Sequence, residues 1–138
     1  MKTFDIQSIE INAHFEKAFA YLSDPHNLPS WTAAFKRVRD GRALTVTEAG
    51  QVEIRLEVDV SRAHGTVDWI MTFPDATVAR AYSRLVDNDG KCIYSFVLMP
   101  PPVPLEQLEG ALEQQAHTLQ EELSVLRSKL EGRPLQRA

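Results

Sequence analysis

The sequence predicts an α+β protein in which an antiparallel sheet packs against one long terminal helix. Residues 51–99 contain successive segments that alternate apolar and polar residues, the pattern of half-buried strands. Residues 105–130 repeat leucine at three- and four-residue spacing, the pattern of one amphipathic helix. Because strands and helices are segregated along the chain, we expect an α+β fold rather than a parallel sheet with alternating helices.

The length and composition indicate one globular domain. The chain has 138 residues, 43% hydrophobic and 25% charged, which are ordinary values for a globular protein. We expect one domain over residues 1–132 and a loose tail over 133–138. The net charge of -4 argues against binding to the phosphate backbone of nucleic acid. No apolar run is long enough to span a membrane, and lone Cys92 cannot close an internal disulfide, so we expect a cytoplasmic monomer or homodimer.

The first quarter of the chain predicts a strand and two short helices. Residues 3–12 suit a strand with a bulge near Gln7–Ser8, because the alternation of its apolar residues breaks there. Residues 14–24 repeat apolar side chains at helical spacing, and Pro25 ends this helix. A second short helix or turn is expected within residues 25–34.

The middle of the chain predicts the sheet. Residues 51–61 alternate strictly, so one face of this strand is apolar and the other is charged. Three more strands are expected at 66–73, 77–86 and 92–99, with turns at Pro74–Asp75 and Asp87–Gly90. A weaker strand is expected within 37–47.

The last third of the chain predicts the long helix. The proline run at 100–102 ends the sheet, Pro104 suits the first helical position, and Gly132 suits the C-cap. The helix between them would be about 27 residues, or ~40 Å, long. Because one helix of this length cannot fill the concavity of a curved sheet, we expect a hollow at one or both of its ends.

Several segments resemble one known superfamily: Ile9–Phe19, Leu22–Pro25, Leu28–Trp31, Gly65–Trp69 and the leucine-rich helix after the proline run. In these segments the chain is similar to SRPBCC proteins, the START-like superfamily that includes polyketide cyclase/dehydrase-like and lipid-transport members. The resemblance implies a helix-grip fold, a curved antiparallel sheet wrapped around a long C-terminal helix, with two short helices after the first strand. It also implies a ligand cavity between sheet and helix, but not one activity.

The parity of the strands suggests which residues would line such a cavity. An even-length loop at 87–90 pairs Leu85 with Cys92 or Tyr94, which places small residues of one strand among aromatic residues of its neighbours. Arg80 and Arg84 would then point outward, within reach of Asp68 and Glu53. The residues expected to line the cavity are Leu56, Trp69, Met71, Ala81, Ser83, Tyr94, Phe96, Gln115 and Leu119. The alternative is that the large apolar residues among them only fill the core.

Motifs of catalysis and metal binding are weak in this sequence. It has no Gly-x-Ser-x-Gly elbow, Cys92 suits a buried structural thiol, and its four histidines lack metal-ligand spacing. Asp24 and His26 could form an acid/base or ligand pair, although a helix cap is the simpler interpretation of Asp24. We therefore expect no metal and no cofactor, and the catalytic residues, if any, are unknown.

One basic cluster stands out between the second short helix and the sheet. Lys36, Arg37, Arg39 and Arg42 place four cations within seven residues. Such a cluster fits a solvated strand edge, or else a contact for an anionic ligand head or a partner surface.

The leading hypothesis is a non-catalytic protein that binds a hydrophobic or lipid-like small molecule. One alternative is a cyclase- or dehydratase-like enzyme acting on a polyketide-type substrate, which would need an inward acid/base group. Another is a protein-interaction module that uses a strand edge or the outer face of the long helix. The leucine stripe would also fit a helix-mediated dimer, but packing on the sheet is the simpler expectation.

Overall fold

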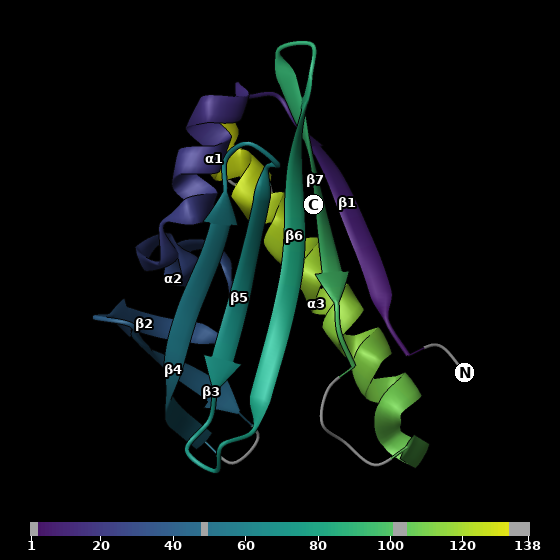
Figure 1. The fold of residues 1–138 in the computed structure, drawn as a ribbon. Helices are drawn as coiled ribbons and strands as arrows, with labels where there is room; N and C mark the ends of the chain where they lie inside the picture. The colour runs from purple at the N-terminus through teal and green to yellow at the C-terminus, as the bar shows by residue number, and fades with distance from the viewer. Residues whose placement is uncertain (1–2, 48–49, 101–104, 133–138) are drawn as a thin grey trace.

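The computed structural model describes residues 3–47, 50–100 and 105–132. Seven strands form one antiparallel sheet in the order β1-β7-β6-β5-β4-β3-β2, which curves around a long helix, α3 (Figure 1). The predicted helix-grip fold is therefore confirmed. The elements are β1 (Asp5–Ile11), α1 (Phe15–Ser23), η1 (Pro25–Asn27), α2 (Leu28–Trp31), β2 (Phe35–Arg39), β3 (Arg42–Thr47), β4 (Gly50–Ser61), β5 (Thr66–Thr72), β6 (Val78–Asn88), β7 (Lys91–Leu98) and α3 (Leu105–Glu131).

The predicted long helix is confirmed at 27 residues. It ends where expected, since Gly132 adopts a φ of 69° and its N–H donates to the carbonyl of Lys129 at 3.3 Å. The predicted positions of Pro101, Pro102, Pro104 and the tail at 133–138 lie outside the described residues. Within the described part of the chain, no helix is long and apolar enough to cross a membrane.

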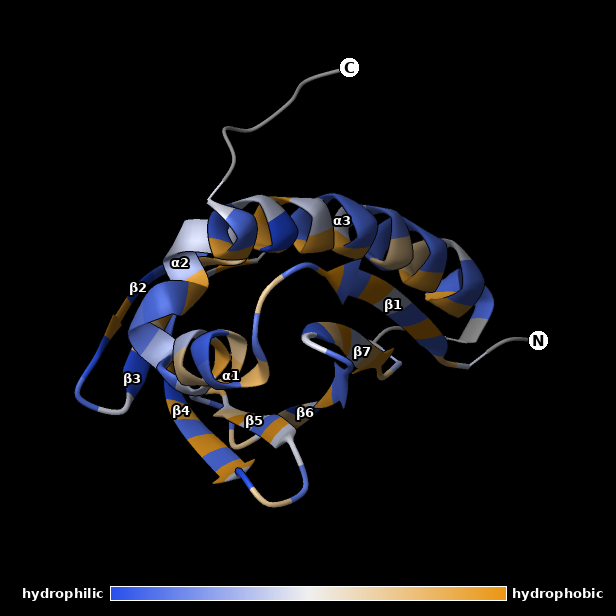
Figure 2. Ribbon diagram, turned by 90° about the horizontal axis from the view of Figure 1, so that it is seen from above, coloured by the Kyte–Doolittle hydropathy of each residue, from blue (hydrophilic) through white to orange (hydrophobic). Residues whose placement is uncertain are grey.

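The two halves of α3 pack differently. Viewed from above, α3 lies across the opening of the curved sheet, with α1 and α2 near its C-terminal half (Figure 2). Four leucines of that half join the main hydrophobic core: Leu119, Leu123, Leu126 and Leu130. Leu108 and Leu112 of the N-terminal half are buried but lie outside this core cluster. The core therefore anchors α3 mainly by its C-terminal half.

Strand β1 corrects one prediction. It pairs with β7 in an unbroken register from Asp5–Leu98 to Ile11–Cys92, so the expected bulge near Gln7–Ser8 is wrong. A bulge would have turned four apolar residues inward at the cost of ladder hydrogen bonds. The regular ladder instead leaves Phe4 and Ile6 exposed by about half on the outer face. Asp5 and Gln7 consequently share the concave face with Ile9 and Ile11.

The segment 35–47 corrects a second prediction, because it forms two strands instead of one weak strand. Strands β2 and β3 make a hairpin that turns at Asp40 and Gly41, whose φ angles are 52° and 74°. This two-residue turn with both φ values positive matches the right-handed twist of paired strands. The Asp40–Gly41 pair was the available sequence signal.

Two carboxylates of α3 fasten the loops around the short helices. Glu122 Oε2 accepts from the backbone N–H of Ala33 at 2.6 Å, and Glu131 Oε2 accepts from that of Asn12 at 2.7 Å. Burial raises the pKa of the Glu122 carboxyl above its usual value, against the lowering effect of the Ala33 hydrogen bond. Desolvation of the Glu122 carboxylate therefore destabilises the folded state, whereas its hydrogen bond to Ala33 stabilises it.

Gly65 is required where the β4–β5 turn approaches β6. Its φ is 71°, and a Cβ added there would lie 2.1 Å from the carbonyl oxygen of Leu85. One backbone hydrogen bond also joins these two residues: the N–H of Leu85 donates to the carbonyl of Gly65 at 2.7 Å. Only glycine permits this close approach of two backbones.

We expect Gly65→Ala to lower the free energy of unfolding by about 2–5 kcal/mol, through left-handed strain plus a backbone clash. Urea titration followed by circular dichroism measures this loss. Gly90→Ala is the matched control, because Gly90 also has a positive φ but a Cβ there meets nothing within 4 Å. Its expected loss is about 1–2 kcal/mol. Equal losses in the two variants would contradict the clash.

We expect Glu122→Gln to stabilise the protein at neutral pH. The amide oxygen can still accept from Ala33, but no charge is desolvated. Folding raises the pKa of Glu122, so its contribution to the free energy of unfolding is fully present below its unfolded pKa and is lost as the pH rises through its folded pKa. The advantage of the variant, measured by urea titration, should therefore shrink as the pH is lowered through the acidic range. Glu109→Gln, on the exposed side of α3, is the control. The same pH profile in both variants would contradict a local effect.

Candidate functional site

The strand register determines which side chains share the concave face. Leu85 pairs with Tyr94 and Ser83 with Phe96, one of the two pairings expected for this hairpin. Trp69 lies opposite Ala81 on β6. Large aromatic residues of β5 and β7 therefore flank small residues of β6 on this face.

The nine residues expected to line a cavity lie at different depths. Five are buried: Leu56, Trp69, Ser83, Tyr94 and Leu119. Met71, Ala81 and Phe96 are half-buried, and Gln115 is exposed. The strand residues of this set share the concave face, while Leu119 belongs to the core stripe of α3. Their role in ligand contact stays a prediction.

Two polar atoms of this face are buried without a partner. Among the described residues, neither the indole Nε1 of Trp69 nor the hydroxyl of Tyr94 makes a hydrogen bond, although Tyr94 is 0% and Trp69 3% exposed. The Ser83 hydroxyl donates to the carbonyl of Val67 at 2.6 Å. Burial raises the pKa of the Tyr94 phenol well above its usual value; the Ser83 hydroxyl lies near enough to oppose this rise in part, but it does not meet the geometry of a hydrogen bond to Tyr94.

Phe96 lies between these two residues. Its ring stacks on that of Trp69 at a centroid distance of 5.8 Å and meets that of Tyr94 edge-on at 6.5 Å. The three rings form a continuous aromatic wall. Half-buried apolar residues extend it on the same face: Met71, Phe73, Ala81 and Leu98.

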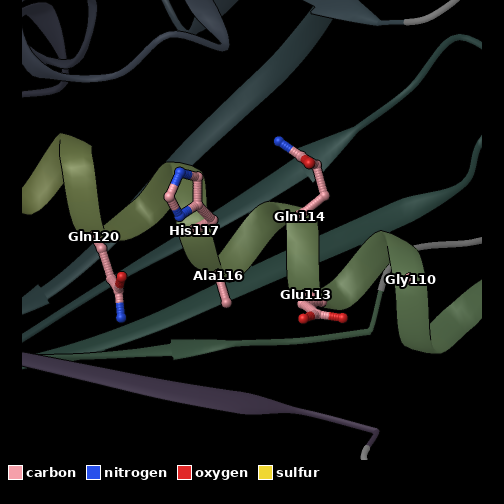
Figure 3. A pocket seen from close by; sticks show the side chains of 6 residues that line it. All are labelled: Gly110, Glu113, Gln114, Ala116, His117 and Gln120. Carbon is pink, nitrogen blue, oxygen red and sulfur yellow. The ribbon is translucent and has the colours of Figure 1, made fainter.

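A cavity of about 470 Å³ opens along residues 110–120 of α3, from its N-terminal half to just past its middle. All six described residues that line it come from this helix, as Figure 3 shows: Gly110, Glu113, Gln114, Ala116, His117 and Gln120. None of the nine predicted residues is among them. The signal that could have found this groove is the recurrence of polar residues three to four apart beside the leucine stripe. This polar pattern is the same as that of any solvent-exposed helix face, so the sequence alone could not identify the groove.

A polar chain connects the groove to the concave face of β1. Gln120 Nε2 donates to Gln7 Oε1 at 3.1 Å, and Gln7 Nε2 donates to Asp5 Oδ2. Asp5 is buried on this face, despite its charge. The groove on α3 and the open side of the sheet are thus joined by hydrogen-bonding groups.

The other candidates from the sequence have structural roles. Asp24 Oδ1 accepts from the backbone N–H of His26 at 3.0 Å and lies 2.9 Å from Nδ1 of its ring, which is the expected cap. Cys92 is fully buried, its Sγ lies 3.1 Å from the carbonyl of Ala13, and burial raises its pKa. Among the described residues, no group of three histidine, cysteine or acidic side chains could hold a metal ion.

The expected ion pairs of Arg80 and Arg84 are wrong, although both arginines are exposed as predicted. Arg84 Nε donates instead to the carbonyl of His64, in the β4–β5 turn, at 3.0 Å. Glu53 pairs with Arg42 instead, and Asp68 accepts from the backbone N–H of Ser83 at 3.3 Å.

Comparisons with known proteins agree with this architecture. A START superfamily protein from Mycobacterium smegmatis is 12% identical, with a TM-score of 0.66 over 95% of this chain and 99% of that one. The Zhui aromatase/cyclase from Streptomyces sp. R1128 is 9% identical, with a TM-score of 0.61 over 94% and 91%. The Aha1 dimer from Colwellia psychrerythraea is 18% identical, with a TM-score of 0.60 over 94% and 97%. At these identities the likeness concerns the fold alone.

The sequence comparison is more specific. No match was found among curated proteins. Residues 6–131, however, match the family described as polyketide cyclase/dehydrase and lipid transport. This match spans the sheet, the short helices and α3, so the chain belongs to the polyketide cyclase/dehydrase and lipid transport family.

Proposed function

We propose that this protein binds an apolar small molecule that carries a hydrogen-bonding group. The ligand would lie between the concave face of the sheet and the N-terminal half of α3. The observation that carries the proposal is a pair of buried polar atoms without a hydrogen bond of ordinary geometry, Trp69 Nε1 and the Tyr94 hydroxyl, on a wall whose other polar group, the Ser83 hydroxyl, donates to the carbonyl of Val67. A buried polar group without a partner costs about 1–3 kcal/mol, which a bound ligand would recover.

The chemistry of these two atoms restricts the ligand. The indole Nε1 can only donate a hydrogen bond, and the Tyr94 phenol, whose pKa burial raises further above neutral pH, is protonated. Both groups therefore offer an N–H or O–H to an acceptor. A ligand with a carbonyl, ether or hydroxyl oxygen on an apolar skeleton would suit them.

The surroundings support an apolar skeleton. Met71, Phe73 and Leu98 are half-buried on the concave face, so they keep apolar surface that a ligand could cover. The polar end of such a ligand could meet the groove on α3, where His117 and Gln120 offer hydrogen bonds. The family description includes both lipid transport and polyketide cyclisation, which are activities on apolar, oxygen-bearing molecules.

Binding without catalysis is the better-supported choice. A protonated, fully buried phenol can orient a ligand but is a poor general base. All four histidines are exposed, and His117 pairs with Glu121 at 3.2 Å on the surface of α3. The likeness to an aromatase/cyclase favours an enzyme only at the level of the fold.

We expect Ala81→Phe to weaken ligand binding at least about tenfold, because its ring would fill the space beside Trp69, the cross-strand neighbour of Ala81. The uncharged fluorescent probe N-phenyl-1-naphthylamine measures binding, with native mass spectrometry of the freshly purified protein for any retained molecule. The control is Val86→Phe on the outer face of the same strand. Circular dichroism establishes that both variants fold. Equal probe binding by the two variants would overturn the proposed site.

We expect Tyr94→Phe to separate ligand recognition from folding. Without ligand, the variant should be as stable as the parent or more so, since a buried orphan hydroxyl is removed. Affinity for an oxygen-bearing apolar ligand, such as a long-chain alcohol, should fall about five- to tenfold. Affinity for an alkane of equal length should not change. A variant that loses stability but no selectivity for the alcohol would contradict the assigned role.

A further inference from the structure

The β2–β3 hairpin and β4 place three arginines side by side on the outer face of the sheet. Arg39 lies opposite Arg42 across the β2–β3 pair, and Arg42 lies opposite Arg55 across the β3–β4 pair. These three residues are here called the arginine row. All are exposed, because the intervening residues Val38, Ala43 and Ile54 are buried on the concave side.

The positions of these arginines are fixed by the backbone. The hairpin turns tightly at Asp40–Gly41, and the N–H of Leu56 on β4 donates to the carbonyl of Gly41 at 2.8 Å. Adjacent strands are about 4.8 Å apart, so the row presents its charges within about 10 Å. Their backbones cannot separate without breaking the ladder.

Charge in this region is only partly balanced. Arg39 Nε lies 3.6 Å from Asp40 Oδ2, and Arg42 Nη1 lies 3.4 Å from Glu53 Oε1, both in solvent-exposed pairs. Among the described residues, no carboxylate lies within 4.0 Å of a guanidinium nitrogen of Arg55 or of Arg37, which neighbours the row on β2. Like charges directly opposite each other destabilise a sheet. The chain has a net charge of -4, so a general excess of basic residues does not explain why these arginines lie together.

The same surface is hollowed. A cavity of about 370 Å³ is lined by Arg37, Arg39, Asp40, Arg42, Ala43, Leu44 and Glu53, while Arg55 of the row lies beside it, opposite Arg42. This volume falls within the range of small-molecule sites. Guanidinium groups pair with phosphoryl oxygens through two parallel N–H bonds, and a phosphate ester brings up to two negative charges. A carboxylate brings one, so it would balance less of the positive charge that Asp40 and Glu53 leave on the arginines.

We propose that the arginine row and the adjoining cavity bind a phosphoryl group of a small molecule or lipid headgroup. This site lies on the opposite face of the sheet from the proposed apolar ligand and does not depend on it. Binding would neutralise charges that folding has forced together, which explains how a cluster that costs stability can be retained.

The test uses the full chain and inorganic pyrophosphate, titrated by isothermal calorimetry at constant ionic strength with sodium chloride as balance. We expect saturable binding that Arg55→Gln weakens at least tenfold. The matched control is Arg80→Gln, an exposed arginine on the outer face of β6 opposite Ile70, which should bind like the parent. Without ligand at low salt, Arg55→Gln should also be at least as stable as the parent, because Arg55 has no carboxylate partner among the residues that the structure describes.

A second arm distinguishes the source of the phosphoryl group. Cosedimentation with phosphatidylcholine vesicles containing phosphatidic acid, but not with phosphatidylcholine alone, would support a lipid headgroup. Pyrophosphate binding without cosedimentation would support a soluble phosphate ester. The proposal is overturned if neither probe binds, if Arg80→Gln loses as much affinity as Arg55→Gln, or if the row binds single-stranded RNA and pyrophosphate does not compete.

Discussion

The attachment of α3 by its C-terminal half is the constraint on which the rest of the structure depends. Leu119, Leu123 and Leu126 enter the core beneath α1 and α2, and Glu122 fixes the loop after α2. The N-terminal half lies beyond that core cluster, although its Leu108 and Leu112 are buried, and Gln120 near the middle of the helix contacts Gln7 of β1. A straight helix on a curved sheet cannot pack equally along its length. The difference between its two halves is therefore a consequence of curvature, and it decides which part of the concave face keeps partly exposed apolar surface.

The sequence predicted best what depends on local periodicity. The alternation in β4 and the leucine spacing in α3 each report one buried face, and both elements were found as expected. Prediction failed where two local preferences conflicted. The break in the apolar alternation predicted a bulge near Gln7–Ser8, but β1 forms a regular ladder with β7 that leaves Phe4 and Ile6 outward and brings Asp5 inward. The groove on α3 and the bond between Gln7 and Gln120 depend on residues far apart in the chain, which periodicity does not report.

The concave wall combines aromatic packing with polar atoms that packing alone does not require. Phe96 packs in the wall with a purely apolar ring. Its neighbours Trp69 and Tyr94 pack in the same wall but also bury an indole N–H and a hydroxyl. Phenylalanine at either position would bury similar area without the cost of an unpaired donor. These two polar atoms therefore add nothing to the stability of the fold, and it is they, rather than the volume around them, on which the proposal of a bound ligand rests.

The two faces of the sheet are linked by the same alternation. In β4, Ile54 and Leu56 must face the core, so Arg55 between them must face out. In the hairpin, Val38 and Ala43 impose the same direction on Arg39 and Arg42. A one-residue slip that separated the arginines would bury them and expose the core, a far larger penalty than their mutual repulsion. The repulsion that Asp40 and Glu53 leave unbalanced therefore persists in the free protein, and counter-charge from solution can reduce it further. Screening by simple salt would do so weakly, whereas a multivalent anion bound to the row would do so at a specific place.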